Sequence, residues 1–125
     1  MKESIASVRR KVLTCLNREV TKIHLIRIGE KERHCAHSEY DLDTPVGKGE
    51  IEMWIDVYNS SLVLAVIHEI LHRILDKHLD TWATYDLYET FLLSLEKEIY
   101  KPLTRKQKRR WRNVINSKVV GRKNI

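Results

Sequence analysis

The chain has 125 residues, 42% of them hydrophobic, a formal net charge of +6 and only two cysteines, Cys15 and Cys35. This length and apolar content predict one domain with a hydrophobic core, and the positive charge points towards an acidic partner. Two cysteines exclude a disulfide framework and indicate reduced thiols in a cytoplasmic protein. No secretory signal is evident in residues 1–20. The apolar run at 62–75 is too short to span a bilayer.

The first elements that the sequence predicts are a helix over residues 4–17 and a strand over residues 20–28. Ser4 stands where an N-cap is expected, and Gly29 ends the strand. The apolar residues of the helix recur at helical spacing: Ile5, Val8, Val12, Leu13 and Leu16.

The longest irregular stretch is predicted over residues 29–49, because they are rich in glycine, aspartate and other turn-forming residues. His34 and His37 lie on either side of Cys35, which is either half of a metal site or part of a solvated loop. A second half-site with matching spacing does not follow in the sequence.

The clearest predicted strand covers residues 50–58, where apolar and polar residues alternate with a period of two. One face is apolar: Ile51, Met53, Ile55 and Val57. The other carries two acids and two aromatic residues, and is expected to be half exposed: Glu52, Trp54, Asp56 and Tyr58.

A buried helix is predicted over residues 61–76, with caps available at residues 59–61, and it contains the motif His-Glu-x-x-His. Residues four apart project from the same side of a helix, so His68 and His72 can hold one metal ion. Imidazole suits zinc, and Glu69 is placed to act as general base on a water activated by that zinc. The alternative is a pair of core histidines with other partners.

A catalytic zinc usually has three protein ligands, so a third is sought downstream. His78 is one candidate, but it lies six residues beyond His72, about 240° further round a continuing helix. Glu89 is preferred, because it lies among apolar residues of a helix predicted over residues 84–103, where a carboxylate needs a partner.

Other acidic residues near these positions offer further roles. Asp86 and Glu96 flank Glu89 in the sequence and are weaker ligand candidates. Asp76 or Asp80 could orient a ligand histidine from behind.

From Lys101 onwards the chain has ten basic and no acidic residues, and residues 101–123 are therefore a possible contact for nucleic acid. Thr104 is expected to cap a last helix. Trp111 could stack on a base, but is more readily an anchor of that helix on the core. A solvated basic tail is the alternative.

The element order and the His-Glu-x-x-His motif, over roughly residues 20–103, resemble the minimal gluzincin-like metallopeptidases of bacteriophages and mobile elements, and more distantly the ImmA/IrrE proteases. The resemblance implies an α+β zincin-like domain (residues 1–103, followed by a basic segment 104–125) that hydrolyses peptide bonds with Zn²⁺. It implies that the strand before the active helix walls the cleft and pairs with extended substrate. The rival hypothesis is a degenerate zincin scaffold that binds nucleic acid or protein through its basic end.

The resemblance also assigns roles to single residues. His68, His72 and Glu89 would bind zinc and Glu69 would be the base, while a tyrosine such as Tyr85 or Tyr88 could stabilise the oxyanion. The chain departs from the wider zincin pattern in three places. Arg73 stands where an uncharged residue is usual, Tyr88 replaces the asparagine that precedes the gluzincin glutamate, and Leu75 replaces the glycine that metzincins need to use a histidine such as His78.

Overall fold

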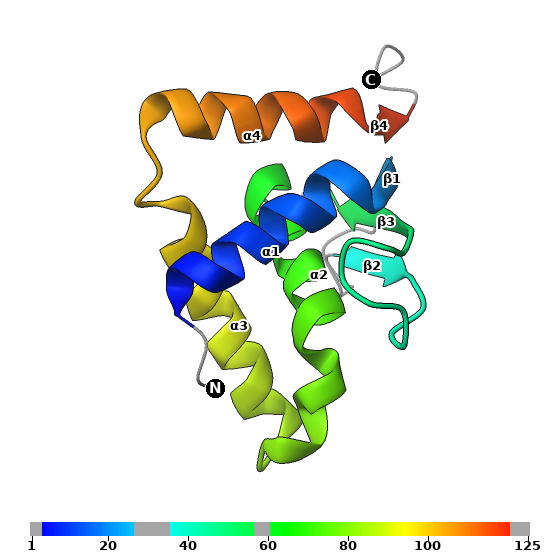
Figure 1. The fold of residues 1–125 in the computed structure, drawn as a ribbon, viewed down its shortest axis with the longest axis vertical. Helices are drawn as coiled ribbons and strands as arrows, with labels where there is room; N and C mark the ends of the chain where they lie inside the picture. Colours follow the sequence, from blue (N-terminus) through cyan, green and yellow to red (C-terminus); the bar gives the residue numbers. More distant parts are fainter. Residues whose placement is uncertain (1–3, 27–35, 57–60, 121–125) are drawn as a thin grey trace.

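The computed structural model describes residues 4–26, 36–56 and 61–120, which form an α+β fold (Figure 1). The elements in chain order are α1 (Ile5–Arg18), β1 (Val20–Ile26), β2 (Ala36–Glu39), β3 (Ile51–Asp56), α2 (Leu62–Leu75), the 3₁₀-helix η1 (Asp76–Thr81), α3 (Tyr85–Tyr100), α4 (Arg105–Ser117) and β4 (Val119–Val120).

The predicted first helix is confirmed as α1, and its N-cap is Ser4, whose hydroxyl accepts a hydrogen bond from the Ser7 amide at 3.1 Å. Ile5 and Leu13 are half-buried against the core, and the other three residues of its apolar stripe are buried, as the spacing predicts: Val8, Val12 and Leu16. Each fully buried aliphatic side chain of this kind contributes about 1.5–3 kcal/mol to stability. The stripe therefore fixes which side of α1 faces the core.

The sheet has the strand order β2-β3-β1-β4, in which β1 is parallel to both neighbours and β2 is antiparallel to β3. The alternation predicted for β3 is confirmed, since Ile51, Met53 and Ile55 are 0% exposed and form part of the core. Asp56 differs from the expectation of a half-exposed polar face, because it is only 1% exposed at the end of the strand.

Strand β2 lies inside the stretch predicted to be irregular, so that prediction is wrong for Ala36–Glu39. These four residues include no β-branched or large apolar side chain, and their extended form comes from pairing with β3. The pairing also corrects the role expected of β3. It has hydrogen-bonded neighbours on both sides, which leaves no free edge for an extended substrate, and the edge strands of the described sheet are β2, next to β3, and β4.

Helix α2 occupies the centre of the molecule, where it contacts α1, α3, β2 and β3 (Figure 1). Its described residues confirm the predicted buried helix, with Val66, Ile67, Ile70 and Leu71 all 0% exposed. Helix α3 packs alongside it, and η1 joins the two at the lower end of Figure 1. Side chains of α3 therefore face the His-Glu-x-x-His segment of α2.

The C-terminal segment packs on the same core. Thr104 and Gln107 form a capping box at the start of α4, and Trp111 and Ile115 are 3% and 0% exposed, so Trp111 anchors the helix as expected. Strand β4 extends the sheet next to β1. Lys118 donates hydrogen bonds to the carbonyls of Leu16 and Asn17 at the end of α1. A domain division after residue 103 stays a prediction.

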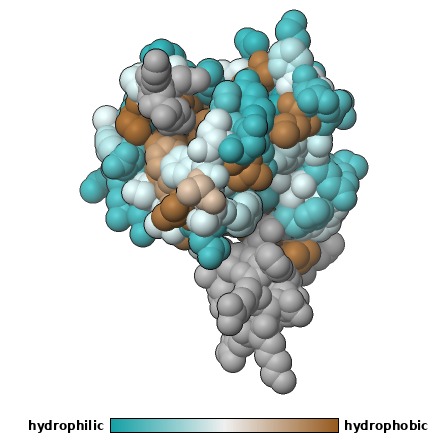
Figure 2. All heavy atoms as spheres, turned by 90° about the horizontal axis from the view of Figure 1, so that it is seen from below, coloured by the Kyte–Doolittle hydropathy of each residue, from teal (hydrophilic) through white to brown (hydrophobic). Residues whose placement is uncertain are grey.

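The surface seen from below in Figure 2 carries hydrophobic side chains in several separate groups among hydrophilic ones. Three of the exposed large hydrophobic residues belong to α3: Tyr85, Leu87 and Leu93. Within the described ranges, none of the helices combines the length and the apolar character needed to cross a membrane.

Candidate metal centre

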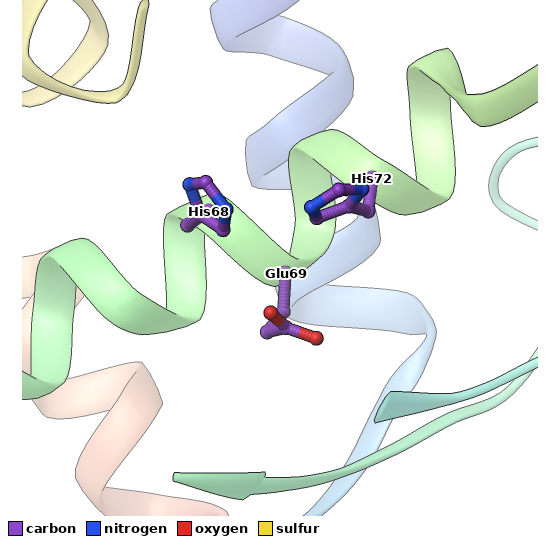
Figure 3. Close-up of side chains that lie close together, drawn as sticks. All are labelled: His68, Glu69 and His72. Atoms are coloured by element: carbon purple, nitrogen blue, oxygen red, sulfur yellow. The ribbon is translucent and has the colours of Figure 1, made fainter. Parts of the chain in front are cut away.

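His68 and His72 project from the same side of α2, one helical turn apart, while Glu69 turns towards the strands (Figure 3). The histidine side chains are 14% and 12% exposed, and Glu69 is 7% exposed. One potential ligand atom from each of the three residues lies within 4.8 Å of the other two. The helical spacing thus places two imidazoles and a carboxylate around one point.

Glu89 of α3 lies opposite the two histidines. Its Oε2 is 3.0 Å from Nε2 of His68, and its Oε1 is 2.6 Å from Nε2 of His72. The carboxylate is therefore shared between the two ring nitrogens. The sequence predicted Glu89 as the third member of this cluster, and the structure brings it there; its role as a ligand stays a prediction.

The other ring nitrogens of the two histidines also face carboxylates. Nδ1 of His68 is 2.9 Å from Oε1 of Glu96, and Nδ1 of His72 is 2.9 Å from Oδ1 of Asp76. An ionised carboxylate only accepts hydrogen bonds, so each Nδ1 donates to Glu96 or Asp76, and each Nε2, which faces Glu89, is the atom at which a metal would replace a hydrogen. Of the two residues expected to orient a ligand histidine, Asp76 or Asp80, the structure places Asp76 on His72, whereas Glu96, considered as a ligand, lies behind His68.

These carboxylates also change the proton affinity of the rings. Burial lowers the pKa of His68 and of His72, but the hydrogen bonds that the rings donate to Glu96 and Asp76 and the negative charge of Glu89 outweigh burial and raise both above the usual value. Burial opposes the charge of Asp76 as well, yet hydrogen bonds from His72 and Tyr88 hold its pKa below the usual range. The centre therefore attracts cations, and protons compete with a metal for both Nε2 atoms.

Three tyrosine hydroxyls support this network. Tyr88 and Tyr40 donate to the two oxygens of Asp76, at 2.7 and 3.2 Å. Tyr85 donates to Oε1 of Glu89 at 3.0 Å, and its ring stacks on that of His72 with centroids 6.5 Å apart. Tyr88 is 1% exposed and Tyr85 is 54% exposed, so only Tyr85 of these two stands at the open side. Tyr40 was not singled out by the sequence.

Ser38 is a second residue that sequence reasoning missed. Ser38 lies on edge strand β2, and its hydroxyl donates a hydrogen bond to Oε1 of Glu69 at 2.7 Å. Ser38 falls in the stretch predicted to be irregular, and the contact joins residues 31 positions apart, so no local pattern could reveal it. The hydrogen bond fixes one oxygen of the proposed base.

Arg73, which is unusual for a zincin motif, is directed into the core rather than to the metal centre. It is 2% exposed and pairs with the fully buried Glu19, with Nη2 and Oε2 2.9 Å apart. It also donates to the Thr44 and Pro45 carbonyls at 2.8 and 3.3 Å. Arg73 therefore ties the 44–49 loop and the end of α1 to α2.

The same loop is held from the other side by Glu19, whose Oε2 accepts the amides of Gly47 and Gly49, each at 2.8 Å. Gly47 has a φ of +94°, a conformation that favours glycine. A Cβ on Gly49 would lie 3.2 Å from both Arg73 Nη2 and Glu19 Oε2. The glycines from which a loop is predicted thus allow its backbone to pack against the buried ion pair of Arg73 and Glu19.

The remaining candidates lie away from the centre. His78, Asp80 and Asp86 are exposed, on η1 and at the start of α3, and His78 makes none of the ring contacts found for His68 and His72. His37 is exposed on β2 beside Glu39 and Trp54. His34 and Cys35 lie outside the described residues.

The donor set fits Zn²⁺. Two imidazole nitrogens and one carboxylate are the ligands of a known class of catalytic zinc site. Ligand atoms about 2.0–2.2 Å from zinc at tetrahedral angles lie roughly 3.3 Å apart. The distances of 2.6 and 3.0 Å from Glu89 to the two Nε2 atoms need only a small expansion to reach that value.

Comparisons of the chain with protein-family models, with curated proteins and with solved structures found no match.

Proposed function

We propose that the protein is a zinc-dependent metallopeptidase with a zincin-like site, in which His68, His72 and Glu89 hold Zn²⁺ and Glu69 is the general base. The observation that carries this proposal is the Glu89 carboxylate lying between the two Nε2 atoms. Nδ1 of His68 donates to Glu96 and Nδ1 of His72 donates to Asp76, and these hydrogen bonds orient the two Nε2 atoms towards a common cation.

A zinc ion held there would lower the pKa of a water molecule and polarise the carbonyl of the scissile peptide bond. Glu69 takes the proton from the water as the water oxygen attacks the carbonyl carbon. It then gives that proton to the nitrogen as the C–N bond breaks. Ser38 occupies one oxygen of Glu69 at 2.7 Å, which leaves the other oxygen to face the reactants.

Tyr85 is the tyrosine that we propose as donor to the developing oxyanion, which would take the hydroxyl hydrogen that Glu89 accepts in this structure. Its hydroxyl lies beside Glu89, and its ring packs on His72 at the exposed side of the centre. Burial and the hydrogen bond and charge of Glu89 raise the pKa of Tyr85 to about 12, so the hydroxyl keeps its hydrogen at neutral pH. Tyr88 is excluded from this role because its hydroxyl is buried against Asp76.

A cytoplasmic location is part of the proposal, because it would keep thiols reduced. Cys15 is a free and buried thiol in the core.

Zinc content and hydrolysis of a mixed fluorogenic peptide library test the function together. Wild type should bind one zinc per chain and cleave peptides, and His68→Ala and His72→Ala should lose both properties. Glu69→Gln should keep zinc and lose activity, and the exposed His78→Ala is the matched control that should keep both. Wild type without zinc, an active Glu69→Gln, or zinc binding without hydrolysis of any peptide would contradict the proposal.

A further inference from the structure

Helix α4 separates apolar from basic residues. Its buried side chains face the core, and the arginines and lysines on its other side are exposed: Arg105, Lys106, Arg109, Arg110 and Arg112. In the described part of the chain, no ion pair joins any of these five cations to an acidic residue. Lys108 is half-buried over the ring of Tyr100.

The charges on α4 repel one another along the helix. Arg105 and Arg109 are four residues apart, as are Lys106 and Arg110, and like charges at this spacing destabilise a helix. The capping box of Thr104 and the burial of Trp111 keep the helix folded in spite of this repulsion. The positive charge is therefore displayed on an ordered surface, and an anionic partner would relieve the repulsion.

Arg105, Arg109 and Arg112 are spaced to share one stripe of the exposed surface, since they follow the helical positions i, i+4 and i+7. Asn113, Asn116 and Ser117 are also exposed on this helix, and they add neutral hydrogen-bonding groups. The 13 residues of α4 extend for about 20 Å, which equals the rise of roughly six phosphates of one strand along the axis of a DNA duplex.

The composition of this surface distinguishes between anionic partners. None of the exposed residues of α4 is apolar, so the helix has no apolar face to insert into a lipid bilayer. Four of the five exposed cations are arginines, whose planar fork matches the geometry of a phosphate. We propose that the exposed basic face of α4 binds the phosphodiester backbone of a nucleic acid without reading its sequence. This inference does not rest on the proposed peptidase activity.

Fluorescence anisotropy with mixed-sequence 20-nucleotide DNA, single- and double-stranded, tests the site in the full chain. The test variant is Arg105→Gln/Arg109→Gln/Arg112→Gln. The matched control, Lys22→Gln/Lys48→Gln/Lys77→Gln, removes the same charge from exposed positions on β1, the 44–49 loop and η1. Glutamine keeps helix propensity, and circular dichroism checks that both variants fold.

We expect wild type to bind at 50 mM salt, with an affinity that falls steeply as salt rises. The test variant should bind at least about tenfold more weakly, with a salt slope smaller by about two to three, and the control should change affinity less than about twofold. If the test variant loses more affinity for one form of DNA, single- or double-stranded, than for the other, that form is the one that α4 contacts. His68→Ala should bind DNA as wild type does.

Three outcomes would overturn the proposal. They are the absence of DNA binding at 50 mM salt, equal losses in the test and control variants, and tighter binding to phosphatidylserine vesicles or to polyglutamate than to either DNA.

Discussion

Arg73 and Glu19 form an ion pair with Nη2 and Oε2 2.9 Å apart, between side chains that are 2% and 0% exposed. The carboxylate also accepts two glycine amides, and the guanidinium donates to two loop carbonyls. Each charge has enough hydrogen-bond partners to offset its burial. Because Arg73 directly follows the His-Glu-x-x-His motif, this pair fixes α2 against α1 and against the loop that precedes β3.

Arg73→Met should lower the free energy of unfolding by about 3–5 kcal/mol, because it leaves Glu19 charged, buried and without its main partner. Urea denaturation of the zinc-free protein measures the loss. The double variant Glu19→Gln/Arg73→Met should recover part of it, since no unpaired charge remains. Additive losses in the two single variants and the double variant would contradict a coupled pair.

Stability should also depend on pH through Glu19. Burial alone would raise its pKa, but hydrogen bonds from Gly49, Arg73, Cys15 and Gly47 outweigh burial and hold the pKa below the usual range of a glutamate. A carboxyl whose folded pKa is depressed contributes stability that is present above its unfolded pKa. This stability is lost as pH falls through the folded pKa.

Urea midpoints measured between pH 7 and pH 3 check that dependence. Wild type should lose stability below about pH 4.5, near the unfolded pKa of glutamate. Glu19→Gln should be less stable at pH 7 and show a shallower loss on acidification. Asp76 adds a contribution of the same sign in both proteins, so the comparison isolates Glu19. Parallel curves would contradict the assignment.

Asp76 should set the zinc affinity through His72. Asp76→Asn removes the charge behind Nδ1, and we expect zinc affinity to fall about 10- to 100-fold, as for other carboxylates that orient a ligand histidine. Tyr40→Phe and Tyr88→Phe each remove one hydroxyl from Asp76 and should have smaller effects of the same sign. Competition with a chromophoric chelator gives the affinities, and unchanged affinity in Asp76→Asn would contradict this role.

Ser38 should affect catalysis without affecting zinc. Ser38→Ala frees Oε1 of Glu69, and the resulting loss of positioning should lower kcat roughly tenfold. Zinc content should match wild type, because Ser38 contacts no proposed ligand. The neighbouring exposed residue His37, changed to alanine, serves as the control on the same strand. Equal effects of the two variants would show that β2 is merely disturbed.

Local patterns account for the helices and for part of the centre. Helical periodicity predicts α1, α2 and α3, the i, i+4 spacing predicts that His68 and His72 lie together, and the apolar neighbours of Glu89 in the sequence indicate that its carboxylate needs a partner. Strand β2 has no such pattern, because Ala36–Glu39 is extended only through its pairing with β3. The sequence therefore could not reveal the contact between Ser38 and Glu69.

The role of Arg73 was hidden for a related reason. Its partner Glu19 is 54 positions away, and both are charged residues that seldom lie fully buried. Comparison with a motif could identify Arg73 as unusual, but only the packing of α1 against α2 shows what it does. Long-range contacts of this kind have no signature in the spacing of residues along the chain.

Glu89→Gln is the sharpest test of the metal centre. The amide has nearly the same size and can still accept the Tyr85 hydrogen bond, but it lacks the charge that zinc and the two rings require. Zinc affinity should fall by more than the 10- to 100-fold typical of residues behind the ligands. Asp86→Asn, which removes a charge from an exposed position three residues earlier on α3, should bind zinc as wild type does. Zinc binding that is equal in wild type and Glu89→Gln, and reduced in His78→Ala, would move the third ligand from α3 to η1.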